Sequence, residues 1–264
     1  MQGIIIATAA VGIIGLIMGL LLIMVDKKFK VETDPRVDAI REHLPGNNCG
    51  ACGYAGCDAM AAAIACQEAP ANGCPVGGNA VADKIAKIMG VEIESTEKMT
   101  AFVKCSGDCD NAVPRAHYVG INDCSAACAS GLSPWACDYG CLGFGSCAAA
   151  CPFDAISIEN GVAVVDRLKC RACGKCVAAC PKHLIEMVPD KSVYAVRCAN
   201  RDRGPAVKKA CSAGCIACRL CEKQCSFDAV HVEDNISHID YEKCTGCGKC
   251  AEKCPVNVIA KRVP

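Results

Sequence analysis

The chain opens with its longest uncharged run, residues 3–25, and continues with much shorter apolar segments. The opening run holds 23 residues without a charged side chain. At about 1.5 Å per residue, a helix of that length spans the roughly 30 Å core of a bilayer. No basic residue precedes the run and lysines follow it, so the pattern predicts an uncleaved transmembrane helix rather than a signal peptide.

The lysines after this run predict its orientation. Lys27, Lys28 and Lys30 follow the run directly, and no lysine or arginine precedes it. Excess positive charge marks the cytoplasmic side of a membrane segment. We therefore predict a single pass with the N-terminus outside and every later residue in a reducing compartment, where disulfides are rare.

The apolar positions of the remaining chain predict short helices and hairpins. An alanine-rich stretch at 57–66 and the segment 81–89 have helical spacing. Short β-branched runs flank 159–161 and again 233–235, a pattern typical of hairpins. Together with the first segment, these elements predict an α+β protein with one N-terminal transmembrane helix and a small α-rich unit ahead of the hairpins.

Cysteine content changes this picture most. Of 264 residues, 27 are cysteine, while aromatic residues make up only 4%. In a reducing compartment, such a content indicates a metal protein rather than a disulfide-stapled one. The formal net charge is zero. With no strongly basic face, the sequence predicts no nucleic-acid partner.

Two cysteine runs have the bacterial ferredoxin spacing C-x2-C-x2-C-x3-C-P. In that motif three cysteines hold one [4Fe–4S] cube and the fourth reaches a second cube. The runs consist of Cys170, Cys173, Cys176 and Cys180, and of Cys244, Cys247, Cys250 and Cys254. Each run therefore predicts a partner run upstream.

The partner runs exist because the ferredoxin pattern is duplicated. Residues 137–188 align without gaps on 211–262 at an offset of 74. This alignment places Cys137, Cys141, Cys147 and Cys151 on Cys211, Cys215, Cys221 and Cys225. The sequence therefore predicts two tandem 2[4Fe–4S] ferredoxin domains.

Ligand assignment differs between the two repeats. In the second repeat the rule gives Cys215, Cys218 and Cys221 with Cys254, and Cys225 with Cys244, Cys247 and Cys250. In the first, Phe144 stands where Cys218 would be, and Cys151 joins Cys170, Cys173 and Cys176. Its other cluster must then use Cys137, Cys141, Cys147 and Cys180; alternatively, Cys137 serves elsewhere and that cluster is incomplete or differently ligated.

A different cysteine pattern lies nearer the N-terminus. Cys49, Cys52, Cys57 and Cys74 have the spacing x2, x4, x16 within a glycine-rich loop. Glycines let such a loop fold tightly and aim backbone N–H groups at sulfides. Four cysteines could also hold zinc. The spacing, in a chain with ferredoxin runs, favours a fifth [4Fe–4S] cluster over zinc.

Seven cysteines remain outside these sets. Cys105, Cys109, Cys124 and Cys128 form two C-x3-C pairs that could together hold a sixth cluster. Cys124 aligns with Cys198 at the offset of 74, which indicates the same task in each repeat. Cys211 is a further candidate ligand. Cys66, on an alanine-rich helix face, is expected to be a small buried hydrophobic residue.

The sequence predicts no catalytic residues. Gly143-x-Gly145-x-x-Ala148 nominally fits a dinucleotide fingerprint, but it lies among cysteines and is interpreted as a cluster-binding loop. There is no Walker A motif, and the histidines are scattered. We therefore expect electron transfer without bond chemistry in this chain, and no direct NAD or flavin binding.

The order of these motifs resembles a known family. An N-terminal anchor, the CGACGYAGC cluster segment and the doubled ferredoxin resemble the B subunit of the Rnf complex, the ion-translocating ferredoxin:NAD oxidoreductase of bacterial membranes, in its longer clostridial and acetogen-like form. The resemblance implies a location in the bacterial inner, cytoplasmic membrane, with soluble reduced ferredoxin and other membrane subunits as partners. It also implies coupling to sodium or proton transport. The alternative is a membrane-tethered polyferredoxin that serves other redox enzymes outside a fixed complex.

Six segments follow from these patterns. They are the anchor and juxtamembrane segment 1–30, a [4Fe–4S] domain 31–92, a cysteine-containing connector 93–136, ferredoxin domain 1 at 137–189, a basic connector 190–210 and ferredoxin domain 2 at 211–264. The basic connector could dock an acidic ferredoxin. Its candidate docking residues are Arg197, Arg201, Arg203, Lys208 and Lys209.

Overall fold

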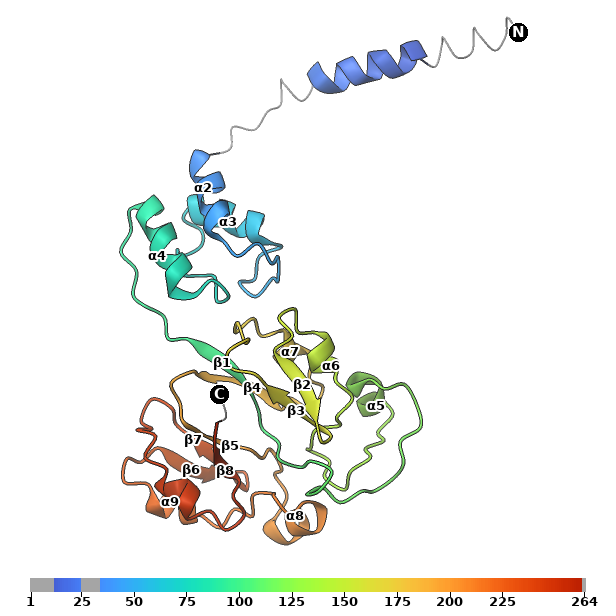
Figure 1. Cartoon of the computed structure of the whole chain (residues 1–264), viewed down its shortest axis with the longest axis vertical. Helices are drawn as coiled ribbons and strands as arrows, with labels where there is room; N and C mark the ends of the chain where they lie inside the picture. The colour runs from blue at the N-terminus through green and yellow to red at the C-terminus, as the bar shows by residue number, and fades with distance from the viewer. Residues whose placement is uncertain (1–11, 25–33, 263–264) are drawn as a thin grey trace, which may run out of the picture.

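The structure, a computed structural model, describes residues 12–24 and 34–262. Figure 1 shows three parts after the N-terminal helix: a group of helices, and two groups of strands and short helices beside each other. An extended segment leads from the helices to the first strand. The cysteine-rich sequence is thus divided among compact units.

The predicted transmembrane helix over 3–25 is contradicted by the structure. Among the helices of 12–24 and 34–262, none is long and apolar enough to cross a membrane. The helix described here, 12–24, has 13 residues. Residues 3–11 and 25–30 of the predicted anchor segment lie outside the described residues. The predicted single-pass topology with the N-terminus outside is therefore not supported by the structure.

Three helices form the first unit: α2 (Pro35–His43), α3 (Cys57–Ala65) and α4 (Gly78–Met89). Asp34 begins α2 by accepting a 2.9 Å hydrogen bond from the backbone N–H of Arg36. Ile40, Met60, Ile64 and Ile85 are almost fully buried between the helices. The small alanine side chains of α3 let α2 pack closely against it, and α4 packs against α2. The helices predicted at 57–66 and 81–89 are therefore confirmed.

Each repeat is made of two antiparallel strand pairs and one-turn helices. In the first repeat β1 (Met99–Val103) pairs with β4 (Ile185–Pro189), and β2 (Ile156–Glu159) pairs with β3 (Val162–Val165). The second contains the pairs β5 (Tyr194–Val196) with β8 (Ile259–Lys261) and β6 (Val230–Glu233) with β7 (Ile236–Ile239). The short helices are α5 (Cys124–Ala129), α6 (Ser146–Ala149), α7 (Lys175–Ala179), α8 (Gly204–Ala210), α9 (Leu220–Gln224) and α10 (Lys249–Glu252).

Both predicted hairpins are confirmed, and their turns explain their sequences. Asn160 and Gly161 have φ values of 45° and 82°, and Asp234 and Asn235 have 47° and 62°. Two successive residues with positive φ are the requirement of a type I′ turn, whose twist matches that of paired strands. Asn, Asp and Gly tolerate this conformation best. The repeats thus share the same turn with different residues.

The strand that completes each repeat comes from the segment before it. Val103 in β1 lies opposite Ile185, and Val196 in β5 lies opposite Ile259. Ile185 and Ile259 are equivalent at the offset of 74, so β1 and β5 are equivalent strands. The segment expected to be a connector between domains therefore supplies a structural strand to the first repeat.

Arg262, directly after β8, ties the end of the second repeat to the first. Its Nη1 donates to the carbonyl of Pro189 at 2.8 Å and to Ser192 Oγ at 2.7 Å, and its Nη2 donates to Thr100 Oγ1. The guanidinium lies 5.7 Å from the centre of the Phe102 ring. Only 6% of Arg262 is exposed. This buried side chain fixes the two repeats relative to each other.

Replacing Arg262 should therefore loosen that junction. We expect Arg262→Ala to remove about 1.5–3 kcal/mol of stability, the range for hydrogen bonds to a charged group, because the hydroxyl of Thr100 is left buried without its donor. The thermal midpoint of the iron-loaded protein should fall by roughly 3–12 °C. The exposed neighbour Lys261 provides the control, and an equal midpoint for Lys261→Ala and Arg262→Ala would contradict the role of Arg262.

Candidate iron–sulfur centres

The cysteine loops share one backbone device that turns them around a central space. Each C-x2-C-x2-C loop, or its equivalent, contains two residues with positive φ two positions apart, and the second one begins a one-turn helix. Such turns point successive N–H groups to one side, as in anion-binding nests. The pairs are Gly143 and Gly145, Ala172 and Gly174, Ala217 and Arg219, and Gly246 and Gly248.

Two cavities have the cysteine sets that the ferredoxin rule predicts. One, of about 310 Å³, is lined by Cys151, Cys170, Cys173 and Cys176. The other, of about 290 Å³, is lined by Cys215, Cys218, Cys221 and Cys254. In both, cysteines far apart in sequence lie around one space, because the strand pairs bring the two halves of each repeat together.

The second repeat brings a further predicted set into proximity. Burial and, to a smaller extent, the charges of Cys244, Cys221 and Cys225 raise the pKa of the Cys250 thiol to about 11. Cys225 Sγ accepts a 3.4 Å hydrogen bond from the backbone N–H of Ala229. Cys247, the fourth member of the set, is exposed. This set therefore lies partly at the surface, next to the site that contains Cys221.

The helical unit holds the predicted set Cys49, Cys52, Cys57 and Cys74. Asn48 Oδ1 accepts a 2.8 Å hydrogen bond from the backbone N–H of Cys57, which secures the start of α3. A 3.4 Å hydrogen bond joins the Gly77 N–H to Cys74 Sγ. Burial raises the pKa of Cys74, and the charges of Cys52 and Cys49 act in the same direction.

Cys124 takes the place in the first repeat that the cysteine spacing predicted for Cys137. A cavity of about 390 Å³ is lined by Cys124, Cys141, Cys147 and Cys180. Burial and, to a smaller extent, the charges of Cys141, Cys124 and Cys180 raise the pKa of Cys147 to about 11. The four sulfurs therefore share one environment, which does not include Cys137 among its lining residues.

The local sequence explains why Cys124 reaches this cavity. Its backbone N–H donates to Ser146 Oγ at 2.8 Å, and that hydroxyl donates to the Asp123 carboxylate at 2.6 Å. These bonds fasten the start of α5 to the start of α6, beside Cys147. The Phe144 ring occupies a different environment, with its centre 4.9 Å from that of Tyr118. The loss of a cysteine at position 144 was the signal that a ligand had to come from elsewhere.

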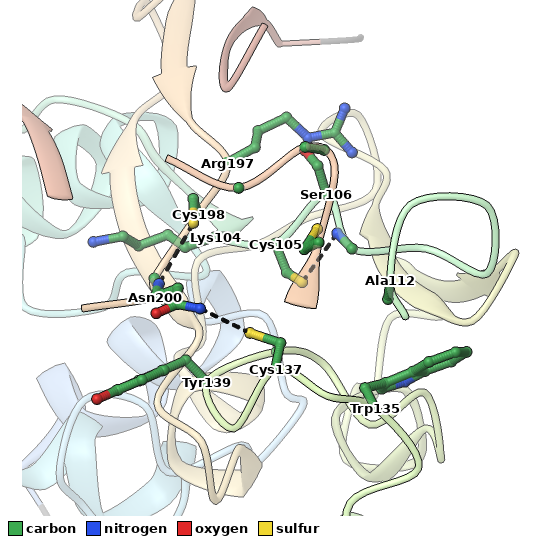
Figure 2. Close-up of a pocket in the computed structure, with 16 residues that line it drawn as sticks. Lys104, Cys105, Ser106, Ala112, Trp135, Cys137, Tyr139, Arg197, Cys198 and Asn200 are labelled. Carbon is green, nitrogen blue, oxygen red and sulfur yellow. Dashed lines mark hydrogen bonds between the residues drawn. The ribbon is translucent and has the colours of Figure 1, made fainter. Parts of the chain in front are cut away.

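Cys137 lies instead with Cys105, Cys198 and Cys211 around a cavity of about 410 Å³ between the repeats (Figure 2). The structure does not bring the two predicted C-x3-C pairs together in one site. Cys105 lines the cavity between the repeats, whereas Cys124 lines the cavity within the first repeat. Cys66, Cys109 and Cys128 line none of these cavities. Cys66 and Cys109 are exposed.

The donor sets fit cubes better than single ions. Within 12–24 and 34–262, no three Cys, His, Asp or Glu side chains lie close enough together to bind one metal ion. A zinc ion draws four sulfurs to bonds of about 2.3 Å from one point. Here four thiols surround a space, and several sulfurs accept backbone N–H bonds at 3.3–3.4 Å. This is the arrangement that thiolates at the corners of a [4Fe–4S] cube require.

Family models match the same regions. The FeS model, an Fe–S cluster domain, matches 44–76; a 4Fe-4S dicluster domain matches 133–181; and a 4Fe-4S binding domain matches 237–260. Several 4Fe–4S-binding domains are therefore present. The matches lie within the helical unit and within both repeats.

Curated relatives extend the match to nearly the whole chain. The B subunit of the Na(+)-translocating ferredoxin:NAD(+) oxidoreductase complex of Acetobacterium woodii is 46% identical over 98% of this chain and 78% of its own length. The chain belongs to the Rnf B-subunit family. The B subunit of the proton-translocating complex of Clostridium ljungdahlii is 43% identical over 98% of this chain and 93% of its own length. The B subunit of an ion-translocating oxidoreductase complex of Methanosarcina acetivorans is 42% identical over 94% and 95%.

Proposed function

We propose that this member of the Rnf B-subunit family is the iron–sulfur electron-transfer component of a membrane-bound, ion-translocating ferredoxin:NAD⁺ oxidoreductase. It accepts electrons from reduced soluble ferredoxin and relays them to the other subunits of the complex. The observation that carries the proposal is the succession of four-cysteine sites from the helical unit through both repeats. The clusters would supply one-electron chemistry, and the chain's own residues hold and space them.

Five clusters follow from these sites. We assign four cysteines to each, with Cys124 in place of Cys137 in the first repeat and the remaining sets as predicted. Their proposed ligands are Cys49, Cys52, Cys57 and Cys74; Cys151, Cys170, Cys173 and Cys176; Cys124, Cys141, Cys147 and Cys180; Cys215, Cys218, Cys221 and Cys254; and Cys225, Cys244, Cys247 and Cys250.

Neighbouring sites are close enough to influence one another. Burial raises the pKa of Cys173, and the charges of Cys151 and Cys49 raise it further, so Cys49 of the helical unit acts on a cysteine of the first repeat. Burial raises the pKa of Cys176 to about 12, with contributions from its own set and from Cys147 of the next site. Such proximity supports transfer between sites within each half of the chain.

The candidate docking residues are largely available to a partner. Arg201, Arg203, Lys208 and Lys209 are exposed, while Arg197 is partly buried. Arg201 lies 4.0 Å from an Asp234 carboxylate, a loose ion pair that leaves most of its charge to solvent. This surface supports the proposal that an acidic ferredoxin docks here.

The first experiment tests the function itself. Anaerobically prepared chain, mixed with reduced ferredoxin, should lose the visible absorbance of its oxidised cubes as they gain electrons. Oxidised ferredoxin is the control and should leave the absorbance unchanged. The proposal fails if the chain's clusters are bleached by a chemical reductant but not by reduced ferredoxin. Native electrophoresis should also find the chain together with other subunits of the complex rather than alone.

The docking surface makes a separate prediction. Reversing two charges in Lys208→Glu/Lys209→Glu should slow reduction by ferredoxin several-fold at low salt, and the difference should shrink as salt screens it. Lys84→Glu/Lys87→Glu on α4 is the matched control, because both pairs are exposed helical lysines that include a residue of the last turn. Equal rates for the two variants at low salt would exclude docking at α8.

The assignment of Cys124 makes a third prediction. Cys124→Ala should lower the iron content of the protein by about four atoms per chain, because its cube loses one of four ligands. Cys128→Ala on the same helix is the control and should retain its iron. If Cys124→Ala keeps the full iron content and an unchanged electron paramagnetic resonance spectrum, the cube of the first repeat does not use this residue.

A further inference from the structure

The cavity between the repeats contains four cysteines that none of the five clusters uses. Cys105, Cys137, Cys198 and Cys211 all line it, and Figure 2 shows the first three around it. Cys105, Cys198 and Cys211 are 7–8% exposed. Cys105 and Cys137 belong to the first repeat and the segment before it, and Cys198 and Cys211 belong to the second repeat and the segment before it. The site therefore exists only where the two repeats meet.

The four cysteines form two equivalent pairs. Cys105 lies two residues after Val103 of β1, and Cys198 lies two residues after Val196 of the equivalent strand β5. Cys137 and Cys211 are equivalent at the offset of 74 that relates the repeats. Each repeat thus supplies one cysteine from the end of its first strand and one from the start of its repeated segment.

Hydrogen bonds to the sulfurs follow the same symmetry. Cys105 Sγ accepts from the N–H of Gly107 at 3.4 Å, and Cys198 Sγ accepts from the N–H of Asn200 at 3.5 Å. Cys105 Sγ also accepts from the Cys141 N–H at 3.4 Å, and Cys198 Sγ from the Cys215 N–H at 3.3 Å. Cys141 and Cys215 are again 74 residues apart. Two sulfurs with matching donors indicate a preserved arrangement.

Contacts across the cavity join the two pairs. Asn200 donates from its backbone to Cys198 Sγ and from its side chain to Cys137 Sγ at 3.4 Å. A Cβ at Gly107 would lie 3.5 Å from Cys211 Sγ and 3.6 Å from Cys105 Sγ, so sulfurs from different repeats approach the same point.

The cavity also suits an anionic group. Lys104 and Arg197, each directly before the strand-end cysteine of its repeat, line it, and the Lys104 Nζ also pairs with Glu186 at 3.2 Å. A [4Fe–4S] cube with four thiolates carries roughly −2 in its oxidised form, and cations and N–H donors stabilise that charge.

We propose that Cys105, Cys137, Cys198 and Cys211 bind a sixth [4Fe–4S] cluster, the junction cluster, which links the two ferredoxin repeats. Cys141 belongs to a cluster of the first repeat and Cys215 to one of the second, and each donates its N–H to a sulfur of the junction cluster. The junction cluster therefore connects the two halves of the relay. Its role in the relay rests on the proposed function; its ligand set does not.

Iron counts with variants test the ligand set. Cys105→Ala, Cys137→Ala and Cys198→Ala should each remove about four iron atoms per chain, and Cys105→Ala/Cys137→Ala should remove no more than either single change. Cys109→Ala, at an exposed cysteine near the same loop, should retain its iron. Loss of about eight atoms in the double variant would return Cys137 to the first repeat and overturn the proposal.

Two measurements keep the test valid if a variant folds poorly. Anomalous diffraction at the iron edge on the unaltered protein should place iron within the cavity, and an iron-free cavity beside loaded neighbouring sites overturns the proposal.

In Cys198→Ala with its other clusters intact, ferredoxin should reduce the clusters of one repeat promptly and those of the other slowly. Uniform prompt reduction would remove the relay role alone. Failure of ferredoxin to reduce the unaltered protein would instead reject the proposed function.

Discussion

Ligation of cubes by cysteine is the interaction on which the folded repeats depend. Their strands have only three to five residues, their short helices four to seven, and aromatic residues are scarce. Such small elements bury too little apolar surface to offset the entropy of ordering the chain. Cysteines make up much of the buried core of both repeats. Where ligands converge only in the folded chain, metal binding contributes directly to the free energy of folding.

This dependence explains how a duplicated sequence can use its cysteines differently in each half. The second repeat keeps Cys218, which lines the cavity that contains Cys215. The first repeat has Phe144 at that position, and the connector carries Cys124 into the equivalent cavity through the bonds of Asp123 and Ser146. Because a cube needs four thiolates but no particular chain order, a ligand can move to another segment without a change in the fold.

The turns and cysteine loops formed by neighbouring residues could be predicted from the sequence, whereas the cluster ligands that come from distant segments could not. The hairpin turns and the C-x2-C-x2-C loops are local patterns, and the structure forms both turns and brings the loop cysteines together. Cys124 and Cys105 lie in the connector 93–136, outside the segments that align without gaps. Extending the offset of 74 into this connector wrongly predicted that Cys198 is the equivalent of Cys124. Strand pairing shows that Cys198 corresponds to Cys105, 93 residues earlier. The sequence did indicate this equivalence, because segment 101–105 (AFVKC) is similar to segment 194–198 (YAVRC). Hydropathy over 3–25 likewise predicted a span that the described helix does not provide.

The place of the basic residues adds a constraint on the direction of the relay. Helix α8 ends at Ala210, directly before Cys211, so Lys208 and Lys209 lie beside the cavity between the repeats. A ferredoxin bound at α8 would deliver electrons first to the middle of the chain rather than to its end. The first repeat and the helical unit would then form the onward route, because Cys49 lies near Cys173. The two clusters of the second repeat would lie off that route and act as a store of electrons. If ferredoxin instead bound near the exposed Cys218 and Cys247, all clusters would lie in series. The position of the docking surface therefore decides whether the duplicated repeat conducts or stores.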